Sequence, residues 1–198
     1  MRLSLPRSVL SVLLSLVLVF AVALAADAGK FHFKSSTFSS SSLTFNGVGV
    51  GLGNSDYLAT MDATATVRAL CENKGGAKAG GRNDIFVSLE GPQDQVIRTE
   101  DSGKTEVSLT VEDPTLADID APPSAKLDCP NGNWEIVDVV VLEWTSAHIS
   151  ITELGTDAVL FDQAYSCTGG GVTLDADGNP IDNGQGGYLL NVVSCQEA

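Results

Sequence analysis

Apolar and polar residues alternate with a period of two along much of the chain. From Tyr57 to Cys71 every odd position is apolar, and most even positions carry hydroxyl or charged side chains. This alternation predicts a long strand with one buried face and one face in water. Shorter stretches of strand-forming residues predict further strands at 31–34, 43–52, 85–90, 95–99, 107–111, 135–143, 147–151, 158–166 and 187–194.

Turn-forming residues separate these predicted strands. Short segments rich in Gly, Asp, Asn and Pro recur at 52–56, 90–94, 100–104, 153–157 and 175–179. Beyond the N-terminal leader no stretch keeps a helical period, so we predict an all-β fold, an immunoglobulin-like antiparallel β-sandwich with disulfides. One predicted strand changes phase around Asn46 and Gly47, which indicates a β-bulge or a tight turn there.

The N-terminus has the three parts of a secretory signal peptide. Arg2 and Arg7 precede an apolar stretch that ends in Ala-Leu-Ala at residues 23–25. A membrane anchor is the alternative, but a spanning helix needs about 20 apolar residues, and the uninterrupted run covers only 16–26. We therefore predict a signal peptide at 1–25 and a single secreted domain at 26–198, with no membrane insertion after cleavage.

The charge of the chain narrows the choice of partners. The formal net charge is −14. Removal of Arg2 and Arg7 with the leader lowers Lys+Arg from 11 to 9 against 25 acidic residues, which makes the mature charge −16. A field of this sign repels nucleic acid and anionic membranes, so neither is expected as a partner.

Four cysteines, Cys71, Cys129, Cys167 and Cys195, remain in the mature chain. An even number in an exported protein predicts two disulfides, for which three connectivities are possible. A zinc site would require closely spaced pairs, and every spacing here is long.

Three segments resemble a family of uncharacterised secreted bacterial proteins. They are GLGNSDYLATMDATATVRALCENKGG at 51–76, CPNGNW at 129–134 and WTSAHISI at 144–151. The resemblance implies a small β-sandwich with Cys71 bonded to Cys129, and it implies no activity. The chain departs from the family pattern after about residue 167, where we predict an added C-terminal hairpin closed by Cys167 and Cys195.

The segment LCENKGGAKAGGRND, residues 70–84, combines glycines with Lys74, Lys78 and Arg82. A phosphate-binding loop would need a lysine after its second glycine and a helix next, and neither is found. The three cations define a possible anion patch. The favoured interpretation is a mobile, solvated loop between two strands, whose glycines permit tight turns.

A second candidate site lies near the C-terminus. Asp175, Asp177, Asn179 and Asp182 are closely spaced oxygen donors and therefore weak candidates for calcium ligands. Gly178 would be fourth in an EF-hand loop, where glycine belongs at the sixth position. The pattern therefore favours a plain turn, and we predict no metal site or cofactor.

Residues that could support catalysis are few. Acidic residues gather in a proline-interrupted stretch at Glu112, Asp113, Asp118 and Asp120. His32 and His148 alternate with apolar neighbours and should face solvent, and no Gly-x-Ser-x-Gly motif is present. Trp134 and Trp144 should pack in the core or at its rim, with stacking on a sugar as the alternative.

These observations favour a secreted, non-catalytic β-sandwich that serves as a structural, adhesive or binding module. Its expected partner is an extracellular protein or a glycan. The alternative is an extracellular carbohydrate- or calcium-binding module. A hydrolase that uses an acidic pair would be the less favoured third class.

Overall fold

The computed structural model describes residues 31–40, 42–91, 95–98, 103–119 and 123–198, and the predicted signal peptide lies outside them. Helix is confined, within these residues, to the single turns η1 (Leu116–Asp118) and α2 (Pro123–Lys126). The strands are β1 (His32–Ser39), β2 (Leu43–Val50), β3 (Asp56–Asn73), β4 (Lys78–Glu90), β5 (Gln95–Arg98), β6 (Lys104–Val111), β7 (Trp134–Glu153), β8 (Val159–Thr168) and β9 (Ser194–Glu197).

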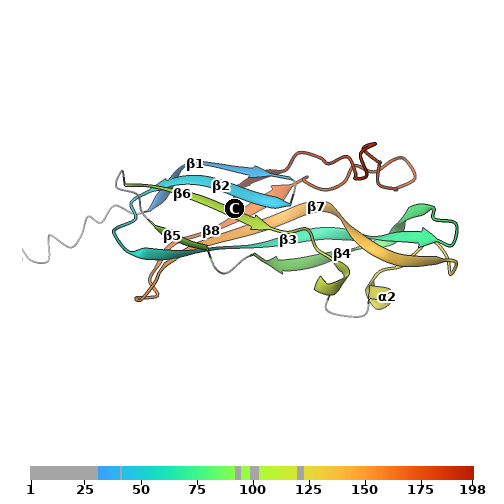
Figure 1. Ribbon diagram of the computed structural model, residues 1–198, viewed down its shortest axis with the longest axis horizontal. Helices are drawn as coiled ribbons and strands as arrows, with labels where there is room; N and C mark the ends of the chain where they lie inside the picture. Colours follow the sequence, from blue (N-terminus) through green and yellow to red (C-terminus); the bar gives the residue numbers. More distant parts are fainter. Residues whose placement is uncertain (1–30, 41, 92–94, 99–102, 120–122) are drawn as a thin grey trace, which may run out of the picture.

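Two antiparallel sheets build the fold (Figure 1). The small sheet has the order β1-β2-β6, and the large sheet has the order β4-β3-β7-β8-β9 with β5 paired to the start of β3. The predicted all-β sandwich is confirmed. The immunoglobulin-like topology stays a prediction.

Strands β3 and β7 are much longer than the strands of the small sheet. They pair from Tyr57 and Glu153 at one end to Asn73 and Trp134 at the other. At about 3.3 Å per residue, the 18 residues of β3 extend well past the eight-residue strands of the small sheet. We call the part beside the small sheet the proximal half. The distal half consists of 68–73, 78–84 and 134–143, which reach beyond the small sheet (Figure 1).

The main core lies between the sheets and follows the odd face of β3. Tyr57, Met61 and Val67 are buried there. The apolar residues of β2 and β6 oppose them, and a cluster of edge-to-face aromatic rings lies beside them. This arrangement explains the alternation seen in the sequence.

The expected bulge or turn at Asn46 and Gly47 is wrong, because β2 runs through this position without a register shift. Gly47 and Gly49 both face the core. A Cβ atom on Gly47 would lie 2.6 Å from the Phe33 ring, and one on Gly49 would lie 2.3 Å from the Phe31 ring. The glycines therefore occupy apolar positions and make room for two phenylalanine rings, which the sequence phase could not reveal.

The predicted strands at 135–143 and 147–151 are one strand, β7. The register shifts where Thr64 pairs with Ser146 but Ala65 pairs with Trp144. Thr145 is the extra residue, and its hydroxyl donates to the Thr64 carbonyl at 3.1 Å. The break between the two predicted strands is therefore a β-bulge within one strand.

The predicted strand at 187–194 is also wrong. Between β8 and β9 the structure has isolated bridges, among them Val172 with Leu190 and Asp182 with Tyr188. Leu189, Leu190 and Val192 remain exposed. An apolar run therefore need not be a core strand when a disulfide tethers the segment that contains it.

Candidate functional site

The described residues between β6 and β7, 112–119 and 123–133, cross the distal half on the same face as the main core, and we call them the connector. Ile119, Leu127 and Cys129 of the connector are buried against the sheet. Cys129 is bonded to Cys71 at the end of β3, as the family resemblance implied. The disulfide and the apolar contacts hold the connector where the small sheet no longer covers the large one.

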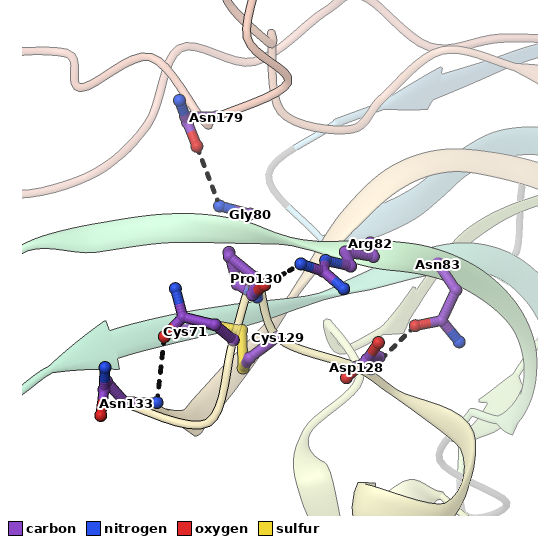
Figure 2. Close-up of a disulfide and its surroundings, with 10 residues drawn as sticks. Cys71, Gly80, Arg82, Asn83, Asp128, Cys129, Pro130, Asn133 and Asn179 are labelled. Atoms are coloured by element: carbon purple, nitrogen blue, oxygen red, sulfur yellow. Dashed lines mark hydrogen bonds between the residues drawn. A yellow bond between two sulfur atoms is a disulfide. The ribbon is translucent and has the colours of Figure 1, made fainter.

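Residues 81–83 of β4 form a seam with the connector (Figure 2). A Cβ atom on Gly81 would lie 2.7 Å from the Asp128 carbonyl oxygen, so only glycine permits this approach. The Arg82 backbone N–H donates to the same carbonyl at 2.9 Å, and the Arg82 guanidinium donates to the Pro130 carbonyl. The Asn83 amide donates to the Lys126 carbonyl and accepts the Asp128 N–H at 2.8 Å.

The mobile loop predicted at 70–84 is therefore wrong over most of its length. Strand β3 continues to Asn73 and β4 begins at Lys78, so only four residues form the turn. The Asn73 side-chain oxygen closes this turn by accepting the N–H groups of Gly75 at 2.8 Å and Ala77 at 3.1 Å. Gly80 and Gly81, which suggested a mobile loop, lie in β4 and permit close contact between this strand and its neighbours.

The C-terminal extension, residues 169–193, covers the other face of the distal half. Val172 packs there with Leu70 and Val140 in a small separate core. The Asn179 side chain accepts the Gly80 N–H at 3.1 Å (Figure 2), and a Cβ atom on Gly80 would meet the Gly178 carbonyl oxygen at 2.6 Å. Gly80 therefore permits close contact with the extension on one face of β4, and Gly81 permits close contact with the connector on the other face.

An ion pair strengthens the attachment of the extension. The Arg68 guanidinium contacts both carboxylate oxygens of Asp84, at 2.6 and 3.1 Å, and donates to the Gly178 carbonyl at 3.3 Å. The disulfide predicted between Cys167 and Cys195 is formed at the base of the extension.

The extension has an internal period of eight residues. Backbone hydrogen bonds join Ile181 to Thr173, Leu189 to Ile181 and Thr173 to Leu189, at 2.7–2.9 Å, and so close a ring of three segments. Asp175 and Asn183, also eight residues apart, each accept the N–H groups two and four positions later. The segment is therefore more elaborate than the predicted hairpin.

The candidate calcium ligands take part in these turns. Asp175 accepts the N–H groups of Asn179 at 2.8 Å and Asp177 at 2.9 Å. These bonds, with that from Asn179 the largest contribution, lower the pKa of Asp175. Asp182 accepts the N–H of Gly184. Within the described part of the chain, no three acidic, histidine or cysteine residues are placed to hold a metal ion.

A cleft with a volume of about 690 Å³ lies between the connector and the distal half. Its apolar surface comes from Leu116, Leu127, Trp134 and Ile136, above the buried Cys129. Trp134 is half-buried there and packs against the core, whereas Trp144 is fully buried within it, so both tryptophans lie in the core or at its rim as expected. Polar groups on the cleft lining come from Arg82, Asp128, Asn131 and Glu135.

The three cations of the predicted anion patch occupy different settings. Of these, only Arg82 lines the cleft. Lys74 lies in the β3–β4 turn, and Lys78 lies at the start of β4 opposite Glu72. Anion binding by the three together stays a prediction.

The candidate acidic residues Glu112, Asp113 and Asp118 lie outside the cleft lining. Asp118 accepts the N–H of Thr115 at 2.7 Å and its hydroxyl at 2.8 Å, which lowers the Asp118 pKa. Glu112 accepts the Ser42 hydroxyl at 3.1 Å. Partial desolvation, and then the charge of Glu112, raise the pKa of Asp113. Asp120 lies outside the described residues.

Comparison with known proteins finds no matching family model, curated protein or solved structure. The family resemblance therefore stays a prediction. Two disulfides indicate an oxidising compartment. In the described residues, neither helical turn approaches the length that a membrane span requires.

Proposed function

We propose that this chain is a secreted, non-catalytic binding module whose cleft takes up a neutral saccharide. The observation that carries the proposal is the position of Trp134. Its ring is half-buried in a cleft of about 690 Å³ and is surrounded by apolar side chains and a few polar ones. A cleft of this size and composition is typical of small-ligand sites.

The chemistry of the lining favours a saccharide. A sugar ring offers apolar C–H faces, which pack on an aromatic ring, and hydroxyl edges, which need donors and acceptors. The side chains of Asp128, Glu135 and Asn131 can accept sugar hydroxyl protons. Arg82 uses one of its five N–H donors on Pro130, which leaves others for the ligand.

The charge of the lining favours a neutral ligand. Two carboxylates, Asp128 and Glu135, face the cleft together with the single guanidinium of Arg82. An anionic sugar would be repelled by the two carboxylates and by the acidic protein as a whole.

The cleft wall is held in place before a ligand arrives. The Cys71–Cys129 disulfide and the seam of residues 81–83 fix the connector to the sheet. Little chain has to be ordered on binding, so more of the contact energy contributes to affinity.

A binding role also agrees with the small number of described residues that could support catalysis. The acidic residues at Glu112, Asp113 and Asp118 do not line the cleft, and neither histidine does. Asp128 and Glu135 are exposed, so neither lies in the apolar surroundings that a general-acid carboxyl requires. The predicted signal peptide supports secretion.

The test uses residues 26–198, purified with both disulfides formed. A glycan array identifies the ligand, and calorimetry then compares the parent with Trp134→Ala. We expect the variant to lose at least about tenfold in affinity, because truncating an aromatic anchor commonly costs more than about 1.4 kcal/mol.

Leu160→Ala, a truncation of a partly exposed residue outside the cleft, is the matched control and should bind as the parent does. A parent that binds no neutral glycan, or a Trp134→Ala variant that binds equally well, would contradict the proposal. Release of sugar products from the ligand would show that the module is catalytic.

A further inference from the structure

The proximal half of the large sheet has a second face that nothing described covers. The small sheet covers the odd face of β3, and the extension covers the opposite face only over the distal half. Along the rest of that opposite face, β3 presents Thr60, Asp62, Thr64 and Thr66, all partly exposed.

Strand register brings hydroxyl groups from four strands into one row. Ser88 of β4 is opposite Thr64 of β3, which is opposite Ser146 of β7, which is opposite Ser166 of β8. The Thr64 and Ser88 oxygens are 3.4 Å apart. Neighbouring strands are about 4.8 Å apart, so the row spans roughly 15 Å across the sheet.

A second row runs beside the first and contains larger polar groups. Glu90 is opposite Asp62, which is opposite His148, which is opposite Ala164. The two rows border a hollow of about 390 Å³, which we call the trough. Its residues are Asp62, Ala63, Thr64, Ser88, Leu89, Glu90, Ser146, Ala147, His148 and Ala164.

The polar groups of the trough suit a ligand that donates hydrogen bonds better than they suit an anion. Among the described residues that line it there is no lysine or arginine, and the histidine there, His148, is paired with Asp162. The Oδ1 atom of Asp62 is buried and has no hydrogen-bond partner. This acceptor is therefore not used by the protein.

We propose that the trough is a second binding site, for a neutral polysaccharide chain lying across the strands. Serine and threonine hydroxyls both donate and accept, and the carboxylates of Asp62 and Glu90 accept, which together complement the hydroxyls of a sugar polymer. The 74% exposed ring of Phe86 lies two residues before Ser88 on β4, at the border of the trough, where it can pack against a sugar face.

Other occupants fit the trough less well. Nucleic acid and sulfated polymers need cations, which its lining lacks. An extended peptide adds to a strand edge through its backbone, whereas the trough lies on the face of the sheet, across β4, β3, β7 and β8. The inference uses none of the residues of the cleft, so it does not depend on the proposed function.

The experiment separates the two sites by working in Trp134→Ala, in which the cleft is impaired. Binding isotherms are measured on insoluble cellulose, chitin and starch. Ser146→Lys places a long charged side chain in the middle of the trough. Thr152→Lys adds the same charge to the same strand and face but outside the trough, and is the matched control.

We expect Trp134→Ala to retain binding to one of these polymers. The further change Ser146→Lys should raise its Kd at least about tenfold, while Thr152→Lys should leave it unchanged. Soluble fragments of that polymer should also shift the NMR signals of the His148 imidazole. Absence of binding in the Trp134→Ala background, or equal binding by the two lysine variants, would overturn the inference.

Discussion

The connector and the extension cover opposite faces of the same half-sheet, but they are held there differently. The connector contributes Ile119, Leu127 and Cys129 to the main core, and β4 hydrogen-bonds to its backbone at Lys126, Asp128 and Pro130. The extension closes a ring of backbone bonds within itself. It contributes the buried Val172 to the small separate core and Val193, at its end, to the main core.

The difference has a functional consequence. A segment that takes its shape from the sheet can form a rigid cleft wall, because a small movement would break several contacts at once. The extension, which is closed on itself, is attached to the sheet through Arg68, Gly80 and its disulfide. Backbone hydrogen bonds also join its first residues to β7, from the Trp144 N–H to Gly169 and from the Val172 N–H to Val141. Changes to the connector should therefore disturb both stability and binding, whereas changes to the extension should disturb stability alone.

The largest expected effect comes from the disulfides. Replacing Cys71 and Cys129 with alanine opens a loop of 58 residues, for which chain entropy predicts a loss of about 4 kcal/mol. Thermal melts should show Tm falling by roughly 10–15 °C, and saccharide affinity should fall because the cleft wall loosens.

Replacing Cys167 and Cys195 opens a loop of 28 residues and should cost nearly as much, about 3.5 kcal/mol. Below its Tm this second variant should still bind saccharide as the parent does. Equal loss of binding in both variants would remove the distinction between connector and extension.

A smaller effect is expected at the paired glycines. Gly81→Ala forces a methyl group against the Asp128 carbonyl, and Gly80→Ala forces one against that of Gly178. Each should cost about 1–3 kcal/mol in denaturant unfolding, but only Gly81→Ala should weaken saccharide binding.

Gly132→Ala is the control for stability, because a Cβ atom there would have no neighbour within 4 Å. Its free energy of unfolding should remain within about 0.5 kcal/mol of the parent value. If Gly81→Ala behaves like this control, then the seam is looser than the structure indicates.

The smallest expected effect is a change in the structure of the extension at low pH. The pKa of Asp175 is lowered from its ordinary value of 3.8 by backbone hydrogen bonds, first that from Asn179. The ionised form therefore stabilises the folded extension above the ordinary pKa, and this contribution is lost as pH falls through the lowered value. NMR spectra recorded between pH 6 and 2 should show the extension changing before the connector.

Asp175→Asn retains an oxygen acceptor without an ionisable group, so it should remove that low-pH change in the extension. Asp177→Asn, at the neighbouring exposed position of the same turn, is the control and should leave it in place. An extension that responds to acid equally in both variants would mean that another group is responsible.

Local patterns predicted most of the strands but not the glycines or the bulge. The alternation from Tyr57 to Cys71 corresponds to β3, because one face of that strand is buried throughout. Gly80 and Gly81 suggested a flexible loop, since glycine is common in loops. Their role depends on carbonyl groups about 50 and 100 residues away, at Asp128 and Gly178, which no local pattern records.

The candidate sites were predicted less completely for the same reason. The sequence identifies Trp134 as an aromatic residue beside a strand, but its place in a cleft depends on the connector folding back along the sheet. The row from Ser88 to Ser166 joins four strands through their register, and single residues of this kind carry no signal of their own.

The sequence by itself determined the all-β class, the long central strand and the acidic character of this protein. These follow from periodicity and composition, which are properties of neighbouring residues and of the whole chain. Tertiary structure decided where β3 and β7 extend beyond the small sheet. It also decided which segment covers each face of the large sheet there, and which face stays open. Those outcomes depend on contacts between residues far apart in the sequence, whose pairing is settled only when the sheets pack and the disulfides close.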